Sequence, residues 1–342
     1  MGKYTTPMFL ADQLGYHAAA YQKDLSGQTV VVVGANVGLG YEAAKHFSTM
    51  GAARVIMACR SKERGAEAVE RVQKETGLKN TELMLVDLAD FASTAKVAAD
   101  LEAKVDRLDL LVLNAGLVSN GPKRQATVDG WEQAIQVNVV ASSILALLLL
   151  PLMIKTSRER HTIPRTVIVA SAVHFWAARW EKEITEQPGL LKALSDLETF
   201  NPINRYWETK LFNILFTRAL NERLRATHPT IIVNAVNPGL CTTNLTRNAD
   251  IPWDMRVRQA VLSVSAEVGS RELVWAALAG SEQAGSLRGQ YISRNAVVEP
   301  SDFVLSEEGR VAQDRIWREI VAVGEKVDPK IGQIVKEYLL DV

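Results

Sequence analysis

Short apolar runs alternate with longer helical stretches along most of the chain, and this alternation restricts the fold more than any other feature. The runs lie at residues 29–34, 53–59, 82–87, 108–114, 165–171, 231–237 and 289–293. Runs of this kind are typical of strands covered on both faces, and the segments between them are long enough for crossover helices. The sequence therefore predicts an α/β fold, a Rossmann-type doubly wound parallel sheet with helices on both faces.

No linker-like composition divides the 342 residues, a length that fits one large α/β domain. We expect a leading arm at 1–25, a single Rossmann-type domain at 26–304, and a C-terminal helical extension of that domain at 305–342. The most apolar run, 139–154, is shorter than the roughly 20 residues of a membrane span and contains Pro151. A buried core helix is therefore favoured over a transmembrane segment.

The charge balance is neutral, with 39 Lys and Arg against 39 Asp and Glu, which gives no support for a nucleic-acid partner. Cys59 and Cys241 lack CxxC spacing and are expected to be buried free thiols, in keeping with a reducing, cytoplasmic location. The histidines show no ligand spacing, so no metal site is predicted. Gly2 and Thr6 match the short N-myristoylation pattern, which would add peripheral membrane association.

A glycine-rich loop, GANVGLG, follows the first apolar run and opens a helix. Glycine permits the sharp turn from strand to helix and lets the backbone approach a pyrophosphate at the helix N-terminus. The spacing is GxxxGxG rather than GxGxxG, and a tight turn that merely needs flexible residues is the alternative. The loop predicts dinucleotide binding by Gly34, Asn36, Val37, Gly38, Leu39 and Gly40.

The end of the second apolar run carries information on the cofactor. The sequence there is ACRSKERG, with Arg60 and Lys62 and no acidic residue at the end of the run. A guanidinium suits a 2′-phosphate, whereas a carboxylate would accept hydrogen bonds from an adenosine ribose. NADP(H) is therefore favoured as the cofactor, and a solvated basic turn is the alternative.

Further motifs follow in order along the chain: NAG at 114–116, Ser171 at the end of the fifth run, and YWETK at 206–210. Together with GANVGLG and NPGL at 237–240, they resemble the short-chain dehydrogenase/reductase family over about residues 27–320. The phrases ACRSKERG, ASAVH and KLFNILFTRAL look most like its retinol-dehydrogenase-like branch.

The resemblance implies roles for the residues that match. The catalytic set would be Asn138, Ser171, Tyr206 and Lys210, with Asn138 supporting a water near the lysine. Further cofactor contacts would come from Asp87, Leu88, Asn114, Ala115, Gly116, Pro238, Gly239 and Thr242, and from Tyr206 and Lys210 themselves. Members of this family often pair as homodimers through helices that correspond here to 129–155 and 204–226, and both regions are apolar enough for burial or association.

The chemistry fits these residue types. Hydride transfer to a carbonyl leaves negative charge on oxygen, which needs a proton donor and a second hydrogen bond. A free tyrosine titrates near ~10, and a neighbouring cation lowers that value. Tyr206 and Lys210 are four residues apart, so they share one helix face, and Ser171 supplies a neutral hydroxyl for the carbonyl.

Aromatic residues mark the segments that follow Ser171 and Gly239, where ligands bind in open α/β sheets. They suggest a bulky apolar small-molecule substrate, and the alternative is that they only pin the segments to the body. The candidate pocket residues are Phe175, Trp176, Trp180 and Trp253. His174, although close to Ser171, is assigned a structural role.

The sequence thus predicts an NADP(H)-dependent oxidoreductase that interconverts a carbonyl and an alcohol, with Tyr206 as general acid/base. Two alternatives stay open. One is a biosynthetic isomerase or cyclase on the same cofactor-binding fold, and the other is a non-catalytic NADP-sensing regulator.

Overall fold

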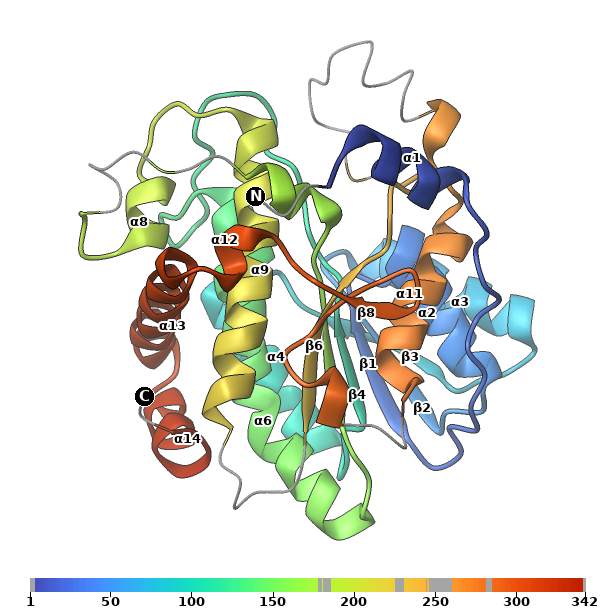
Figure 1. Cartoon of the computed structure of the whole chain (residues 1–342). Coiled ribbons are helices and arrows are strands. Elements are labelled where there is room, and N and C mark those ends of the chain that lie inside the picture. Colours follow the sequence, from blue (N-terminus) through green and yellow to red (C-terminus); the bar gives the residue numbers. More distant parts are fainter. Residues whose placement is uncertain are drawn as a thin grey trace.

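The computed structural model describes residues 4–177, 180, 186–224, 231–243, 245, 260–280 and 285–340. These residues contain an eight-stranded sheet in the order β3-β2-β1-β4-β5-β6-β7-β8, and Figure 1 shows helices on both of its faces. Neighbouring strands are parallel except for β7 and β8, which are antiparallel. The predicted Rossmann-type fold is confirmed.

Seven strands coincide with the predicted apolar runs. They are β1 (Thr29–Val33), β2 (Arg54–Cys59), β3 (Thr81–Leu85), β4 (Leu110–Leu113), β5 (Arg165–Val169), β6 (Ile232–Asn237) and β7 (Tyr291–Ser293). Every residue of β1, β4, β5 and β6 is buried, as expected of central parallel strands. The sequence did not predict β8 (Ala296–Val298), a short edge strand that follows a tight turn with positive φ at Arg294 and Asn295.

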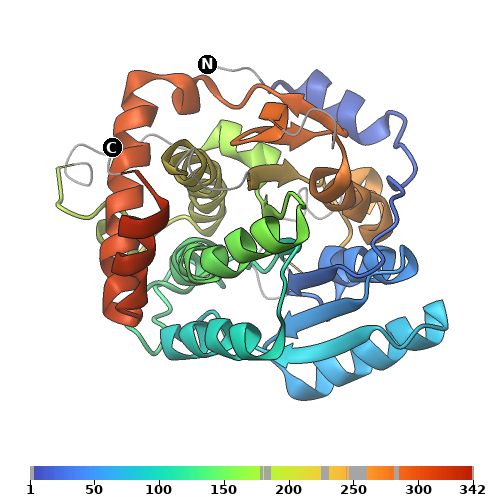
Figure 2. The ribbon, with the colours of Figure 1, turned by 90° about the horizontal axis from the view of Figure 1, so that it is seen from below.

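The helices form two layers, which Figure 2 shows from below. One apolar core lies between the sheet and α4 (Phe91–Lys104), α6 (Ala141–Arg160) and α9 (Pro202–Arg223). The other lies between the opposite face and α2 (Gly38–Thr49), α3 (Lys62–Thr76) and α11 (Ala266–Leu278). Because both faces are covered, the sheet has only its strand ends available for ligands.

The most apolar run forms α6, which is preceded by α5 (Gln133–Ile135) and a single π-helical segment, Gln136–Val140. Within the described residues, Gln133–Arg160 is the one helix long and apolar enough to cross a membrane, with a mean hydropathy of 2.4. Of its most apolar window, 94% is buried inside the protein. Packing on all sides therefore accounts for the composition of this helix.

The C-terminal residues form α12 (Asp302–Leu305), α13 (Glu307–Val327) and α14 (Lys330–Tyr338), and the last two cover α9 and α6. Trp317 stacks on Phe216 of α9 with a centroid distance of 6.0 Å, and Arg223 pairs with Asp314 at 2.7 Å. Burial by the chain's own helices thus accounts for the apolar surface in the two regions that could otherwise serve association.

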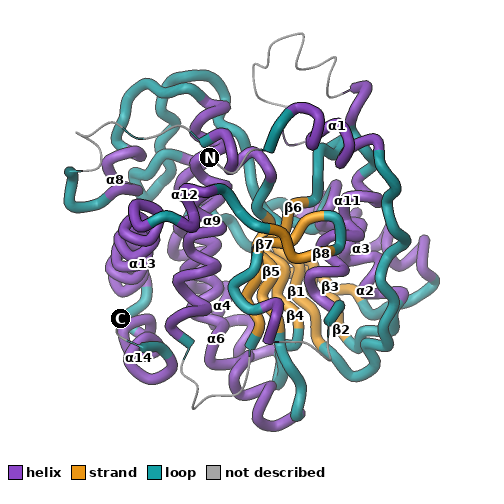
Figure 3. The backbone as a smooth tube through the Cα atoms, in the orientation of Figure 1, coloured by secondary structure: helices purple, strands orange, loops and turns teal. Residues whose placement is uncertain are grey.

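The leading arm carries a helix, α1 (Thr6–Leu14), which Figure 3 shows above the strands. Its Gln13 side chain contacts Leu240, just after the carboxyl end of β6. Thr5 caps its first turn, and Pro7 occupies the first turn, where a missing amide hydrogen costs nothing. The arm then runs along α11 to Leu25, which is fully buried. The arm is therefore packed onto the body of the protein rather than set apart from it.

Candidate active site

The glycine loop and the NAG segment meet backbone to backbone at the carboxyl ends of β1 and β4. Gly34 has a φ of +84°, and a Cβ placed on it would lie 2.8 Å from the Ala115 Cα. A Cβ on Gly40 would lie 2.4 Å from the Gly34 carbonyl oxygen and 2.6 Å from the Asn114 Nδ2. Asn114 Nδ2 donates to that same carbonyl at 2.9 Å. Only glycine fits at these two positions, because the glycine loop and the NAG segment pack directly against each other.

The first turn of α2 follows the glycine loop, and no side chain caps its amides. Val37 is the N-cap residue and offers no side-chain acceptor, and Gly38 has a φ of +64°. A helix N-terminus with free amides beside a glycine-lined groove suits a pyrophosphate. The residues Asn36, Val37 and Leu39, predicted from sequence for this site, all lie on the loop or in this first turn. The uncapped amides and the glycines of this turn therefore fit the phosphates of a dinucleotide.

Arg60 and Lys62 lie where they were expected, directly after β2, and both are exposed. Ser61 between them caps α3 by accepting from the Arg64 amide at 3.3 Å. Neither basic residue forms an ion pair with a described residue. Two exposed cations at the end of β2, next to the glycine loop, provide a place for an additional phosphate.

Asp87 and Leu88 follow β3 at the same edge. The Asp87 carboxylate accepts from the Ala89 amide at 3.0 Å, and Leu88 is buried. The amide of Val86 donates to the Cys59 carbonyl at 3.1 Å, which holds this turn against the end of β2. The predicted adenine-side residues thus lie next to the end of β2, which the basic turn follows.

Asn138 lies on the π-helical segment before α6 and is almost completely buried. Its Nδ2 donates to the Leu117 carbonyl at 2.8 Å and to the Thr209 Oγ1 at 3.1 Å, while its Oδ1 accepts from the Leu117 amide at 2.8 Å. π-Helical turns are common at functional sites. Here the side chain joins the segment after NAG to α9.

Tyr206 and Lys210 lie on one face of α9, whose first turn is capped by Asn201. The Lys210 Nζ is 5.4 Å from the centroid of the Tyr206 ring and donates to the Val169 carbonyl at 2.7 Å. A Cβ on Gly116 would lie 3.7 Å from this Nζ and 3.5 Å from the Asn138 Oδ1. NAG, Asn138 and the Tyr–Lys pair therefore converge on one spot at the end of β4 and β5.

Burial governs the titration of this pair. Burial lowers the pKa of Lys210 to about 8. Burial also raises the pKa of Tyr206 well above its ordinary value, with a smaller contribution from Cys241. This differs from the expected lowering by the lysine, because the loss of hydration of the phenolate is the largest effect on this group.

Ser171 follows β5 and begins the short 3₁₀-helix Ala172–Trp176. Its hydroxyl accepts from the Val173 amide at 3.3 Å, and its carbonyl accepts from the Nδ1 of His174 at 2.8 Å. The other ring nitrogen of His174 accepts from the Ser301 amide at 3.1 Å. The buried imidazole thereby ties the turn that carries Ser171 to the segment before α12.

Asn237 was not singled out from the sequence, although it is the first residue of NPGL. Its Oδ1 accepts from the amides of Ala172 at 3.0 Å and Gly239 at 3.2 Å, and its Nδ2 donates to the Ser293 hydroxyl at 3.0 Å. One side chain therefore joins the ends of β5, β6 and β7. The signal in the sequence was an asparagine at the end of a buried strand.

The predicted pocket aromatics are used largely for packing in this structure. Phe175 stacks on Tyr4 with a centroid distance of 5.4 Å, and Trp176 packs on Tyr4 and Trp207 and is 39% exposed. Trp180 stacks on Phe212 at 5.4 Å, on the side of the C-terminal helices. Trp253 lies outside the described residues. Their role in substrate binding stays a prediction.

A small apolar cluster forms around Val118 and includes Tyr206, and sequence reasoning did not single it out. Val118 is buried, and Ile203, Tyr206 and Leu245 pack against it. Val118 follows NAG, Ile203 is about one helical turn before Tyr206, and Leu245 follows β6. Single aliphatic residues on three separate segments give no periodic pattern, so they became visible only in the fold.

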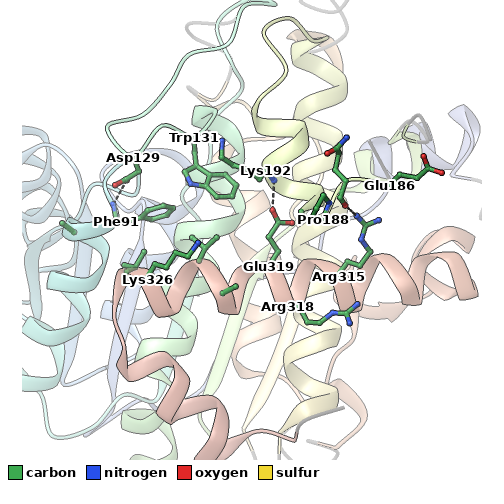
Figure 4. A pocket seen from close by; sticks show the side chains of 16 residues that line it. Phe91, Asp129, Trp131, Glu186, Pro188, Lys192, Arg315, Arg318, Glu319 and Lys326 are labelled. Carbon is green, nitrogen blue, oxygen red and sulfur yellow. Dashed lines mark hydrogen bonds between the residues drawn. The ribbon is translucent and has the colours of Figure 1, made fainter. Parts of the chain in front are cut away.

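A groove of about 1180 Å³ lies elsewhere, between α13, the start of α4 and the segment before α8 (Leu190–Ser195), as Figure 4 shows. None of the predicted site residues lines it. Two of its carboxylates are engaged with backbone amides. Asp129 accepts from Phe91 at 2.8 Å, and Glu319 accepts from Leu191 at 2.8 Å. This groove reflects helix packing, and the chemistry converges at the strand ends.

The fold and the site define a dinucleotide-binding oxidoreductase with a serine, a tyrosine and a lysine at the strand ends. The model of the short chain dehydrogenase family matches residues 28–174. The short chain dehydrogenase/reductase dmxR8 of Cryptosporiopsis sp. is 33% identical over 94% of this chain and 98% of its own length. The short chain dehydrogenase atnD of Emericella nidulans is 37% identical over 77% of this chain and 82% of its own length.

Solved structures agree on the fold. A short chain dehydrogenase from Escherichia coli CFT073, described as complexed with NADPH, has a TM-score of 0.59 at 21% identity and covers 81% of this chain and 100% of its own. One from Shigella flexneri 2a, described as complexed with NADP, has a TM-score of 0.58 at 20% identity, with coverage of 81% and 100%. The chain belongs to the short-chain dehydrogenase/reductase family and is an oxidoreductase of that family.

The buried His174 gives a pH-dependent contribution to stability. Burial lowers its pKa from the ordinary 6.5 to about 4. The unfolded chain therefore binds more protons than the folded one between these values, and stability falls as the pH drops from 6.5 towards 4. The full displacement corresponds to about 3 kcal/mol of unfolding free energy. Chemical denaturation at a series of pH values should show this loss in the wild type and a shallower slope in His174→Gln.

The matched control is His161→Asn, because His161 is exposed and has a positive φ that asparagine tolerates. In His161→Asn, the unfolding free energy should change with pH as it does in the wild type. If the unfolding free energy of His174→Gln fell with pH between 6.5 and 4 as steeply as that of the wild type, His174 would not be the group that causes the loss. The ring would then not be a buried neutral imidazole that joins Ser171 to Ser301.

Proposed function

We propose that this protein is an NADP(H)-dependent reductase or dehydrogenase that interconverts a carbonyl and an alcohol on a bulky apolar substrate. The convergence of NAG, Asn138, Tyr206 and Lys210 at one strand-end site carries the proposal. The cofactor, when bound, supplies or accepts the hydride. The residues of the chain bind it, hold the carbonyl and move the proton.

Each side chain has a distinct part in this proposal. Ser171 holds the carbonyl oxygen by a hydrogen bond, and Tyr206 donates the proton as charge develops there. Lys210 favours the phenolate that remains, because a buried ammonium nearby stabilises an anion in a low-dielectric site. Asn138 keeps the segment after NAG fixed against α9, next to Lys210.

The basic turn after β2 supports NADP(H) over NAD(H). Arg60 and Lys62 are exposed there, and the E. coli and Shigella flexneri structures are described as complexes with NADPH and NADP. Arg60→Ala should weaken NADPH binding roughly 10- to 150-fold, the equivalent of one charged hydrogen bond of about 1.5–3 kcal/mol. NADH binding should hardly change. Titration of protein fluorescence with each cofactor measures both constants.

Lys74→Ala is the matched control, since it removes one exposed positive charge at the far end of α3. It should leave both affinities unchanged. Equal affinity of the wild type for NADPH and NADH would contradict the proposed preference for NADP(H).

The assignment of Tyr206 as proton donor is tested by Tyr206→Phe, which removes one oxygen and keeps the ring. Turnover should fall by ~10²–10⁴-fold, the usual effect of a general acid–base group, while NADPH affinity stays nearly constant. Lys210→Ala should lower both turnover and affinity. The measurement is NADPH absorbance during turnover together with a binding titration.

Tyr16→Phe provides the control, because Tyr16 is 83% exposed and belongs to the arm. Near-full turnover in Tyr206→Phe would mean that another group is the acid. Product formation with no net change in NADPH absorbance would instead favour an isomerase or cyclase, and cofactor binding without any product would favour a sensing regulator.

The apolar surroundings of Tyr206 support a bulky apolar substrate. Tyr206, Ile203 and Leu245 all pack against Val118, and an apolar pocket with a few polar groups is typical of small-molecule sites. A panel of carbonyl compounds graded by size and polarity should show higher kcat/KM for bulky apolar members. Leu245→Ala and Trp253→Ala should reduce that preference. Equal turnover of small polar carbonyls, with the ranking unchanged in both variants, would refute the substrate class.

A further inference from the structure

The segment that follows β6 closes on itself just after the NPGL motif. The Thr242 amide donates to the Val264 carbonyl at 2.8 Å, and the Val264 amide donates to the Leu240 carbonyl at 3.0 Å. The hydroxyls of Thr242 and Ser263 are 2.7 Å apart. We call this pairing of residues 240–242 with 262–264 the neck. The neck thus holds Thr242 and Ser263 next to each other, although they lie 21 residues apart in the sequence.

A side chain from the opposite end of the protein completes the neck. Gln13 of α1 is only 5% exposed, and its Nε2 donates to the carbonyls of Leu240 and Leu262, both at 2.9 Å. Its Oε1 accepts from the Leu240 amide at 2.9 Å. The carboxamide therefore uses both donors and an acceptor on the two strands of the neck, which makes it a cross-link rather than a surface contact.

The neck lies against the cofactor site. A Cβ on Gly38 would lie 3.6 Å from the Thr243 Cγ2, so the glycine loop faces the residue after Thr242. Gly239 has a φ of +77°, and a Cβ on it would lie 2.9 Å from the Gln13 Oε1. A glycine is thus needed in NPGL partly to admit the carboxamide.

The other end of α1 reaches the turn that carries Ser171. The ring of Tyr4 stacks on Phe175 and lies 5.9 Å from Trp176, whose Nε1 donates to the Tyr4 carbonyl at 3.4 Å. Between the two ends, Asp12 pairs with Arg294 of the β7–β8 turn at 3.0 Å. The helix α1 and Tyr4 just before it therefore contact the segments after β5, β6 and β7.

We propose that Gln13 of α1 is a positioning residue, which holds the neck so that Gly239 and Thr242 are set for the cofactor. The inference rests on the proposed function, because it assigns Gly239 and Thr242 to the nicotinamide end. Without the carboxamide, the Leu240 amide and the Leu262 carbonyl lose these partners, and the Leu240 carbonyl keeps only the Val264 amide. The neck is then free to shift away from the glycine loop.

The test compares Gln13→Met with the wild type in the full-length chain. Methionine keeps the length and packing of the side chain and removes all three hydrogen bonds. We expect a tenfold or greater rise in the dissociation constant for NADPH and a similar rise in KM for the best carbonyl of the panel. The backbone amide of Leu240 should exchange with deuterium at least tenfold faster, while the amides of β1 keep their protection.

Leu14→Ala is the matched control, since Leu14 is the next residue on the same helix and is 69% exposed. It should change none of these quantities by more than twofold. Gln13→Glu, which keeps one acceptor for the Leu240 amide but loses both donors, serves as a second variant. It should raise the NADPH dissociation constant as Gln13→Met does. If the β1 amides of Gln13→Met lose their protection from exchange, that variant has not folded, and Gln13→Glu then tests the positioning role alone.

The outcomes separate the two proposals. Wild-type protein that neither binds NADPH nor reduces any carbonyl refutes the proposed function, and the role of Gln13 falls with it. Wild-type activity with NADPH affinity and KM within twofold in both Gln13 variants overturns the positioning role alone. Unchanged exchange at the Leu240 amide in Gln13→Met also overturns it, because the carboxamide would not then hold the neck.

Discussion

At the carboxyl ends of β1 and β4, two stretches of main chain approach so closely that no side chain fits between them. The space at Gly34 is limited by the Ala115 backbone, and the space at Gly40 is limited by the Gly34 carbonyl and Asn114. This contact requires the central strands to be parallel neighbours, as they are. It places the uncapped start of α2 beside NAG, and Asn138, Tyr206 and Lys210 are then arranged around the far end of NAG.

A second requirement is that charged and polar groups at this site stay buried yet partnered. Lys210 keeps one strong hydrogen bond to the Val169 carbonyl, and Asn138 uses its whole carboxamide on Leu117 and Thr209. The lysine thus has donors left for a ligand, whereas the asparagine is fully committed to holding main chain. The two residues differ in function for this reason, although both lie at the same spot.

The strands β1 to β7, the glycine loop and the Tyr–Lys pair could be predicted because each is encoded within a short stretch of sequence. Alternating apolar runs report burial directly, and a four-residue spacing on a helix reports a shared face. Gln13, Asn237 and the cluster around Val118 could not be predicted in this way. Their partners lie far away in the chain, and a buried carboxamide leaves no periodic signal.

The aromatic residues predicted to line the substrate pocket pack on elements that are remote in the sequence, and their role in substrate binding therefore stays a prediction. Phe175 and Trp180 were expected near a ligand because they follow Ser171. In the fold, the ring of Phe175 meets the leading arm and the ring of Trp180 meets α9 and the C-terminal region. Sequence position located the segment correctly at the strand ends, but the direction of each ring depends on which remote element packs against it.

The hydrogen bonds of Gln13 to Leu240 and Leu262 span 227 and 249 residues of sequence. On the ribosome, α1 emerges more than 200 residues before the neck that it binds. The helix has too few residues to be stable alone in water, so it stays unstructured until then. Docking of α1 is consequently a late event in folding, and the order of synthesis keeps the site incomplete until both the sheet and its last parallel strands are in place.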